Sequence, residues 1–307
     1  MEPKEIIGID HGNKNMKSIH SVFESAISKL QGQPGSLQNV LEYQGQYFFI
    51  GGTQIEEKID KTADDDFYFL TLVSLARELS YRGKRKAVVR IAAGLPPRWY
   101  ISQRKSFREY LMRKKELYFK FEGIPYQITL ESADVYLQGF SAISSQLSQY
   151  DGFTLLVDIG GGTVDLIPIE DGIALIDKCK IDTGAAIKCI NMVNESAVAA
   201  FGYKVPTNMI EKIMRAGTMD CDPEYLKVIQ QELCRYANEV YRMISGFGYN
   251  LKLTKLVFLG GGASVIKHFG DNEGRQVSFI TDISANAKGY EDTGKKIMQA
   301  RMKKQAG

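Results

Sequence analysis

The segment that most restricts the fold of this chain lies near its middle, where an apolar run ends at a carboxylate and a row of glycines. The run covers residues 155–157, Asp158 follows it, and Gly160–Gly162 precede the hydroxyl of Thr163. A strand that is apolar on both faces needs burial on both faces, as in the centre of an α/β sheet. Three consecutive glycines carry no Cβ, so backbone N–H groups at this strand end can approach a phosphate closely.

Two further segments repeat this order of apolar strand and glycine turn. Near the N-terminus an apolar strand ends at Asp10 and is followed by Gly12 and Lys17, and near the C-terminus residues 255–259 lead into a glycine run that begins at Gly260. Three such turns exceed what chain reversal alone requires. We expect the first two, one from each of two domains, to clamp a nucleoside triphosphate between them.

The pattern of strands and helices predicts an α/β protein of two domains built on one plan. A three-strand meander over residues 153–180 repeats the layout that begins near residue 4, and helical periodicity follows each meander. We expect domains at 1–147, with a small insertion subdomain at about 28–85, and at 148–307. The expected helices cover residues 64–81, 101–113, 132–147, 183–200, 207–215 and 223–245, with one more closing the chain.

Composition favours a soluble cytoplasmic protein. The chain has 307 residues, enough for two cores, and a formal net charge of +3, too small to indicate nucleic acid by itself. Its four cysteines lack the C-x-x-C spacing of metal or redox sites, so reduced thiols are expected. We expect no secretory signal and no membrane span, because the first residues are charged and no apolar run reaches about eighteen residues.

The glycine turns together resemble the motifs of a known superfamily. Asp10, Gly12 and Lys17 have the spacing of the first phosphate loop of the actin, sugar kinase and heat-shock chaperone ATPases, and Asp158–Asp165 resembles the second loop. Gly260–Ala263 resembles the adenosine motif of that superfamily. The resemblance implies an actin-like fold, in which two duplicated α/β domains hold a nucleotide in the cleft between them.

Shorter motifs resemble those of the ParM-like actins that segregate bacterial plasmids. These motifs are Asn15-Met16-Lys17, Glu131-Ser132-Ala133 and Asn286-Ala287-x-Gly289-Tyr290. The resemblance implies that Glu131 orients or deprotonates the attacking water. On the residues alone, a helix-capping or surface carboxylate is the favoured interpretation of Glu131, because its spacing does not single it out.

The remaining site residues follow from what each side chain can do within such a fold. Asp10 and Asp158 would hold Mg²⁺ largely through its waters, and Lys17 would supply positive charge to the phosphates. The expected nucleotide-binding residues are Asp10, Gly12, Asn13, Lys14, Asn15, Lys17, Gly160, Gly161, Gly162, Thr163, Asp165, Asp182, Thr183, Gly184, Arg235, Glu239, Gly260, Gly261, Gly262 and Ala263.

Two groups in that set have an alternative role. Asp182, Thr183 and Gly184 lead into a helix, which they could cap, or they could approach the ribose. Arg235 and Glu239 lie on a different face of their helix from its apolar residues, where we expect them within reach of the adenosine. His11 lies inside the first loop, and we expect no catalytic role for it.

The resemblance implies an ATPase, or a GTPase, that polymerises head to tail with bound nucleotide and disassembles after hydrolysis. Such a filament would segregate plasmid DNA through an adaptor protein on the plasmid centromere, so the partners expected are further copies of the chain and this adaptor, with no direct DNA or membrane contact. A sugar or acetate kinase of the same fold is the main alternative, and a monomeric chaperone-like ATPase is another. Light scattering on addition of nucleotide would distinguish a filament from a kinase.

Overall fold

The computed structural model describes residues 4–56 and 58–306 and contains two compact units. The chain up to Ser145 forms the first unit together with the segment from Ser284 onward, and Gln146–Ile283 form the second. The sequence places a boundary after residue 147 and keeps residues 284–306 with the second domain, whereas the contacts group this segment with the first unit. In the described residues no helix is long and apolar enough to cross a membrane.

The first unit is built on one nine-stranded sheet. Its strands are ordered β3-β2-β1-β7-β9-β8-β5-β6-β4, and β7 pairs in parallel with both β1 and β9. The strands are β1 (Glu5–His11), β2 (Asn15–Lys17), β3 (Val22–Glu24), β4 (Ala26–Leu30), β5 (Val40–Tyr43), β6 (Gln46–Gln54), β7 (Lys86–Leu95), β8 (Glu116–Phe121) and β9 (Ile124–Leu137). The segment 28–85, expected as an insertion subdomain, thus contributes β5 and β6 to the same sheet.

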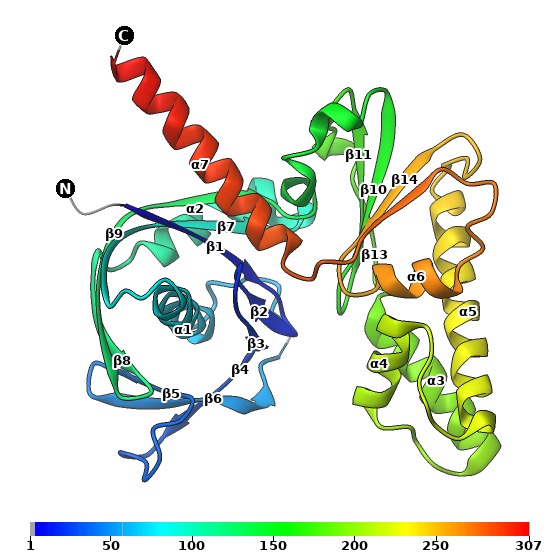
Figure 1. The fold of residues 1–307 in the computed structure, drawn as a ribbon, viewed down its shortest axis with the longest axis horizontal. Coiled ribbons are helices and arrows are strands. Elements are labelled where there is room, and N and C mark those ends of the chain that lie inside the picture. The colour runs from blue at the N-terminus through cyan, green and yellow to red at the C-terminus, as the bar shows by residue number, and fades with distance from the viewer. Residues whose placement is uncertain (1–3, 57, 307) are drawn as a thin grey trace. The chain divides into compact units, whose positions relative to one another are not determined.

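Helix α1 (Asp66–Tyr81) is the core of this unit. The strands curve around it, as Figure 1 shows, and 11 of its 16 residues are buried. A helix that is apolar on most of its surface is stable only when it is enclosed in this way. Helix α2 (Pro97–Leu111), by contrast, buries only a narrow stripe, which packs on β7 and β9.

Helix α7 (Ala285–Ala306) contacts the sheet through close backbone approaches at glycines. A Cβ atom at Gly8 of β1 would overlap the carbonyl of Ala287, and one at Gly94 of β7 would overlap the ring of Tyr290. A Cβ atom at Gly289 would likewise overlap the Ser141 carbonyl. These approaches explain why the C-terminal segment belongs to the first unit.

The second unit repeats the central plan of the first around a six-stranded sheet. In both units the first strand pairs antiparallel with the next strand and parallel with a later one, β1 with β2 and β7, and β10 with β11 and β14. The strands are β10 (Phe153–Ile159), β11 (Val164–Glu170), β12 (Ile173–Ala174), β13 (Lys180–Asp182), β14 (Lys255–Leu259) and β15 (Val277–Ile280), and the helices are α3 (Ala186–Phe201), α4 (Thr207–Ala216), α5 (Pro223–Gly246) and α6 (Ala263–Phe269). The prediction of an α/β fold with a duplicated plan is confirmed.

The expected helix over residues 132–147 is wrong. Strand β9 continues to Leu137, and two short 3₁₀ turns follow at Phe140–Ile143 and Leu147–Gln149. The β-branched and aromatic side chains of Val135 and Tyr136 favour the strand, and parallel pairing with β7 runs to its last residue. Short 3₁₀ turns and α6 were missed because they are too brief to show a helical period.

Other expected elements needed smaller corrections. Alternation along residues 17–28 predicts a single strand, but the structure divides this part of the chain among β2, β3 and β4, because a tight turn closed by Ser18 N and Ser21 O (2.8 Å) interrupts it. The helices expected at 64–81, 207–215 and 223–245 correspond to α1, α4 and α5.

His11, the last residue of β1, is a core residue. Its ring lies edge-on to the rings of Phe67 and Phe107, and its Nε2 donates to Thr71 Oγ1 (2.9 Å), which itself donates to the Phe67 carbonyl. Burial lowers the pKa of His11 to about 3, and the nearby Lys61 cation acts in the same direction. The imidazole is therefore neutral at physiological pH and packs as a core side chain.

Replacement of Gly289 by alanine should destabilise the protein by about 1–3 kcal/mol, because its Cβ would meet the backbone of Ser141. Gly294→Ala in the same helix is the matched control, since the nearest atom to its Cβ would be in the side chain of Ile6, at 3.2 Å. Urea unfolding followed by circular dichroism measures both. Equal midpoints for the two variants would contradict the packing described for α7.

The buried neutral His11 predicts a loss of stability in acid. The unfolded chain binds a proton at this residue below a pH of about 6.5 and the folded chain does not until about 3, so the folded state loses roughly 1.4 kcal/mol per pH unit in that window. Urea midpoints measured from pH 7 to pH 4 should show a shallower decline for His11→Gln than for the wild type. His268→Gln, at an exposed ring, should keep the wild-type slope.

Candidate functional site

The first glycine turn lies at the carboxyl end of β1. Asp10 pairs in register with Lys17 of β2, and Lys17 Nζ lies 3.0 Å from Asp10 Oδ2. Gly12 is required between them, since a Cβ atom there would lie 2.6 Å from the Asn15 carbonyl. Asp10 and Lys17 thus lie together as the sequence predicts, on the two sides of a turn too tight for a larger residue.

Side chains from outside the turn fix its backbone. Ser25 Oγ donates to the carbonyl of Gly12 (2.6 Å), Gln54 Nε2 donates to that of Asn13 (3.0 Å), and the buried Lys61 donates to that of His11. None of these three donors was predicted from the sequence, because they come from segments with no recognisable motif. Successive carbonyls held in this way leave the turn little conformational freedom.

Asp10 has the properties of a ligand-binding carboxylate. It is almost fully buried, and its Oδ1 accepts no hydrogen bond within the part of the chain that the structure describes. A buried carboxylate oxygen normally has a partner, and a water bound to a cation would supply one. Asp10 therefore fits the role predicted for it at a hydrated Mg²⁺.

The second glycine turn contains a pair of buried carboxylates. Asp158 of β10 and Asp165 of β11 lie directly opposite each other, and each is only 4% exposed. Burial raises the pKa of Asp165 to about 7, with a further contribution from the Asp158 charge, against a lowering effect of Thr163. Since like charges this close repel, the pair favours a cation or a shared proton.

The third glycine turn packs directly on the second. Gly260 has a φ of +83°, and a Cβ atom there would lie 2.5 Å from Asp158 Oδ1 and 2.6 Å from the Ile159 carbonyl. Gly262 N donates to the same carbonyl (3.0 Å), and Ala263 begins α6. Gly261 is exposed with open space around it. The predicted residues of the second and third turns are thus brought together within the second unit.

The start of α3 supports the second turn from another side. The N–H groups of Ala186 and Ile187 donate to the carbonyls of Gly160 (3.3 Å) and Gly161 (3.0 Å). The predicted capping of this helix by Asp182 is wrong. The N-cap is Ala185 without a side-chain bond, and Asp182 Oδ1 instead accepts from Gly184 N (2.7 Å), closing a tight turn in which a Cβ on Gly184 would meet that carboxylate.

Arg235 and Glu239 lie on α5 beside α3. Lys188 Nζ of α3 lies 2.9 Å from Glu239 Oε2, and Arg235 pairs with Glu232 at 3.0 Å. Lys188 also adjoins the Asp182–Gly184 turn, since a Cβ atom on Gly184 would lie 3.7 Å from its Cδ. The Lys188 side chain therefore connects the predicted α5 pair with the Asp182 turn. Its position was missed because a single lysine on a helix carries no sequence signal.

The register of the first unit places Glu131 at the wrong end of the sheet for its predicted role. Glu131 lies between Leu130 and Ser132, which pair with Val89 and Arg90, and Val89 in turn pairs with Glu5. Glu131 therefore lies at the level of Glu5 and Ile6 along the strand direction, four to five residues before Asp10, or about 15 Å along the strands. Glu131 instead makes ion pairs with Lys4 and with Arg90 (3.2 Å). The surface carboxylate, left open from the residues alone, fits this position.

Gln138 lies at the correct end of the sheet. Ile9 pairs with Ala93 and Ala93 with Val135, so the level of Asp10 corresponds to Tyr136, two residues before Gln138. Since β7 separates β1 from β9, the two strand ends lie about 10 Å apart across the sheet. The sequence analysis missed Gln138, although an apolar strand followed by a polar side chain and Gly139 repeats the order seen at Asp10 and Asp158.

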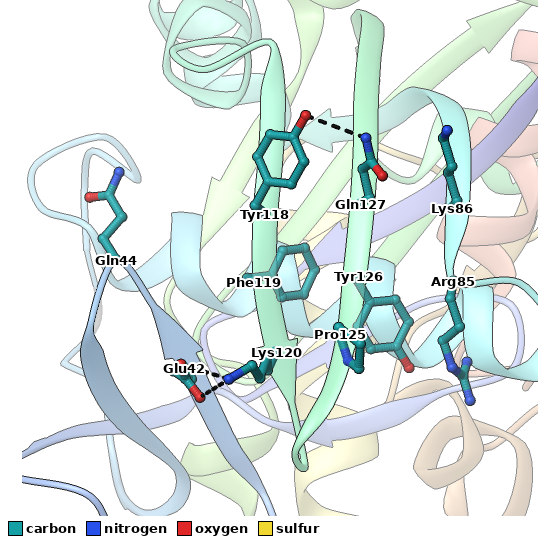
Figure 2. A pocket seen from close by; sticks show the side chains of 10 residues that line it. All are labelled: Glu42, Gln44, Arg85, Lys86, Tyr118, Phe119, Lys120, Pro125, Tyr126 and Gln127. Carbon is teal, nitrogen blue, oxygen red and sulfur yellow. Dashed lines mark hydrogen bonds and ion pairs between the residues drawn. The ribbon is translucent and has the colours of Figure 1, made fainter.

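A cavity of about 510 Å³ in the first unit is separate from these turns. It lies on the outer face of the sheet over β5, β8, β9 and the start of β7, where Figure 2 shows Tyr118, Gln127 and Lys86 in one row. Lys86 precedes the level of Glu5 by three residues, so the cavity is at the opposite end of the strands from Asp10. It is no part of the candidate site.

The comparisons with known proteins agree with the fold. Residues 8–140 match the family model described as the N-terminal domain of actin-like proteins. No curated protein matches the chain by sequence.

Solved structures similar to this chain are themselves actin-like proteins. Actin-like protein Alp7A aligns with a TM-score of 0.77 at 14% identity over 100% of both chains. Ta0583, an archaeal actin homolog, aligns with a TM-score of 0.76 at 19% identity over 96% of this chain and 100% of its own. Bacillus thuringiensis ParM with ATP gives 0.71 and 14% over 94% and 97%. The expectation of an actin-like fold is confirmed: the chain has this fold, and its residues 8–140 match the N-terminal domain of the actin-like proteins.

Proposed function

We propose that this protein is an actin-like ATPase, or GTPase, whose nucleotide state controls its assembly into filaments. The observation that carries the proposal is the second glycine turn, where the carboxylates Asp158 and Asp165 lie opposite each other. The backbone of Gly260 packs so closely on this turn that a Cβ atom there would lie 2.5 Å from Asp158 Oδ1. Buried carboxylates beside a glycine backbone suit a phosphate with its bound cation. Bacillus thuringiensis ParM has been solved with ATP and with AMPPNP, and Ta0583 with ADP.

Both glycine turns bind phosphate oxygens in this proposal, and the first also supplies a positive charge. The N–H groups of residues 12–15 and 161–163 bind phosphate oxygens, whereas Gly160 N–H closes the second turn by donating to the Thr163 carbonyl (2.9 Å). Lys17 adds charge that Asp10 holds in place at 3.0 Å. The Asp182–Gly184 turn, Arg235 and Glu239 bind the nucleoside from the second unit. Loss of the terminal phosphate on hydrolysis removes a ligand of these backbone N–H groups and so changes the state of the protein.

Mg²⁺ would be held mainly by phosphate oxygens and waters. Within the described residues no cluster of three His, Cys, Asp or Glu side chains forms a metal cage. In the first turn Asp10, whose buried Oδ1 accepts no hydrogen bond from a described residue, suits a hydrated cation, and in the second turn Asp158 is the residue proposed for the same role. When bound, Mg²⁺ would neutralise phosphate charge during transfer to water.

Gln138 replaces Glu131 as the residue that orients the attacking water. A carboxamide can accept a hydrogen bond from water and donate one to a phosphate oxygen, which is what positioning requires. Gln138 lies at the loop end of β9, whereas Glu131 lies about 15 Å back along the strands from the level of Asp10, engaged with Lys4 and Arg90.

Self-assembly and plasmid segregation extend the proposal beyond catalysis. The solved structures similar to this chain include a filament of Alp12 and a ParM protein of pSK41. We propose that copies of this chain assemble head to tail in the cytoplasm and that an adaptor protein links the filament to plasmid DNA. A sugar or acetate kinase is the alternative, and it would need an acceptor pocket beside the phosphates.

Addition of Mg-ATP or Mg-GTP to the purified protein should raise ninety-degree light scattering, which then declines as phosphate is released. Asp158→Ala should abolish both signals, because it removes a carboxylate from the phosphate loop. Asp177→Ala, at a carboxylate of the same unit outside the glycine turns, should behave as wild type. If neither nucleotide changes the scattering at high protein concentration and hydrolysis requires a sugar or acetate acceptor, the chain is a kinase.

Replacement of Gln138 by alanine should lower kcat for hydrolysis roughly 100-fold with little change in nucleotide affinity, because the water loses its orienting group. Glu131→Ala should leave kcat within about twofold and cost less than about 1 kcal/mol in stability, since its ion pairs are partly exposed to solvent. Single-turnover phosphate release and fluorescent-nucleotide titration measure kcat and affinity, and urea unfolding measures stability. The opposite ranking of the two variants would restore Glu131 to the hydrolytic role.

A further inference from the structure

Asn286 of α7 makes a direct contact with the turn that carries Gln138. Its Oδ1 accepts a hydrogen bond from Gly139 N at 2.8 Å, and the Asn286 side chain is only 7% exposed. Gly139 has φ +78° and ψ −62°, a conformation that favours glycine, and it directly follows Gln138. The side chain of Asn286 thus satisfies the first backbone N–H after the proposed water-orienting residue.

Further residues of α7 hold the rest of this segment at helical spacing. Gly289 packs on the Ser141 carbonyl, Thr293 Oγ1 donates to Ser144 Oγ (3.2 Å), and Lys296 Nζ donates to Ser144 O (3.4 Å). With Asn286 these positions follow intervals of three, four and three residues, which form one face of a helix. One face of α7 therefore lies along residues 139–144.

Among the described residues few other hydrogen bonds restrain the turn, one of them the bond that Ser141 Oγ donates to the Leu137 carbonyl (2.9 Å). Gln138 N donates to the Leu95 carbonyl (2.9 Å) as the last backbone bond from β7, and a 3₁₀ turn of four residues begins at Phe140. Such a short turn has little stability of its own. A buried N–H at Gly139 without an acceptor would seek another partner, and the turn would shift with it.

From these contacts we infer that Asn286 is a positioning residue for hydrolysis, acting through Gly139 on the Gln138 side chain. The inference rests on the proposed function, and in particular on Gln138 as the water-orienting residue. It gives the Asn-Ala-x-Gly-Tyr motif a physical role, in which Asn286 fixes the turn, Gly289 permits its close approach, and Tyr290 packs under Gly94 at the end of β7.

The test compares Asn286→Ala with Asn272→Ala as a matched control. Asn272 is also a partly buried asparagine that binds backbone, through Nδ2 to the Ile266 carbonyl (3.0 Å), but it lies just beyond α6 in the second unit. Hydrogen exchange over residues 137–143 measures the amide protection of the turn. Single-turnover phosphate release measures kcat, and nucleotide titration measures affinity. Asn286→Asp, which keeps an acceptor for Gly139 N–H, serves as the conservative variant.

We expect Asn286→Ala to lose amide protection over residues 137–143 and to lower kcat about 10- to 100-fold with nearly unchanged nucleotide affinity, since small misplacements of a positioned group have effects of this size. In Asn286→Asp the logarithm of the fold-loss in kcat should be at most half of that in Asn286→Ala. Asn272→Ala should keep wild-type kcat. Faster exchange with unchanged kcat would overturn the positioning role and leave a purely structural contact. Unchanged exchange would overturn the contact itself.

These outcomes are distinct from failure of the proposed function. A wild-type chain that neither binds nor hydrolyses nucleotide would contradict that function and, with it, the catalytic part of the inference. The exchange measurement needs no nucleotide, so it would still decide whether Asn286 holds the Gln138 turn.

Discussion

The close approach of α7 to the strands of the first sheet is the contact on which the first unit's candidate site depends. Gly8, Gly94 and Gly289 each allow backbone or ring atoms to occupy the space of a Cβ, and Asn286 adds a hydrogen bond to the turn after β9. The carboxyl ends of neighbouring parallel strands form one edge, which is where α/β sheets bind ligands. Because α7 packs near this edge, it influences the geometry of residues that precede it by more than 140 positions.

The second unit achieves a comparable arrangement with different contacts. Among its described residues no helix packs on the strands at glycines as α7 does in the first unit; instead the turn at Gly260 and Gly262 packs directly on the turn at Gly160–Gly162. The N–H groups at the start of α3 donate to the carbonyls of Gly160 and Gly161. The result is a closely packed backbone around Asp158 and Asp165, and burial raises the pKa of Asp165 to about 7. Both units thus place buried carboxylates beside backbone turns that only glycine permits.

The sequence predicted the features that depend on local pattern. Apolar runs located β1, β10 and β14, helical periodicity located α1, α4 and α5, and glycine turns located the carboxylates Asp10 and Asp158. Site residues that depend on sheet register could not be predicted in the same way. Glu131 and Gln138 are seven residues apart on one segment, and only the pairing of β9 with β7 shows which of them reaches the level of Asp10.

The central proposal is that the glycine turns bind the phosphates of a nucleotide and that Gln138, not Glu131, lies beside its terminal phosphate. A crystal or electron cryo-microscopy structure with Mg²⁺ and AMPPNP tests it most directly. The account predicts phosphate oxygens within hydrogen-bond distance of backbone N–H groups in both 12–15 and 161–163, with Gln138 within one water of the γ-phosphate. A nucleotide bound through only one loop, or with Glu131 rather than Gln138 beside the γ-phosphate, would contradict it.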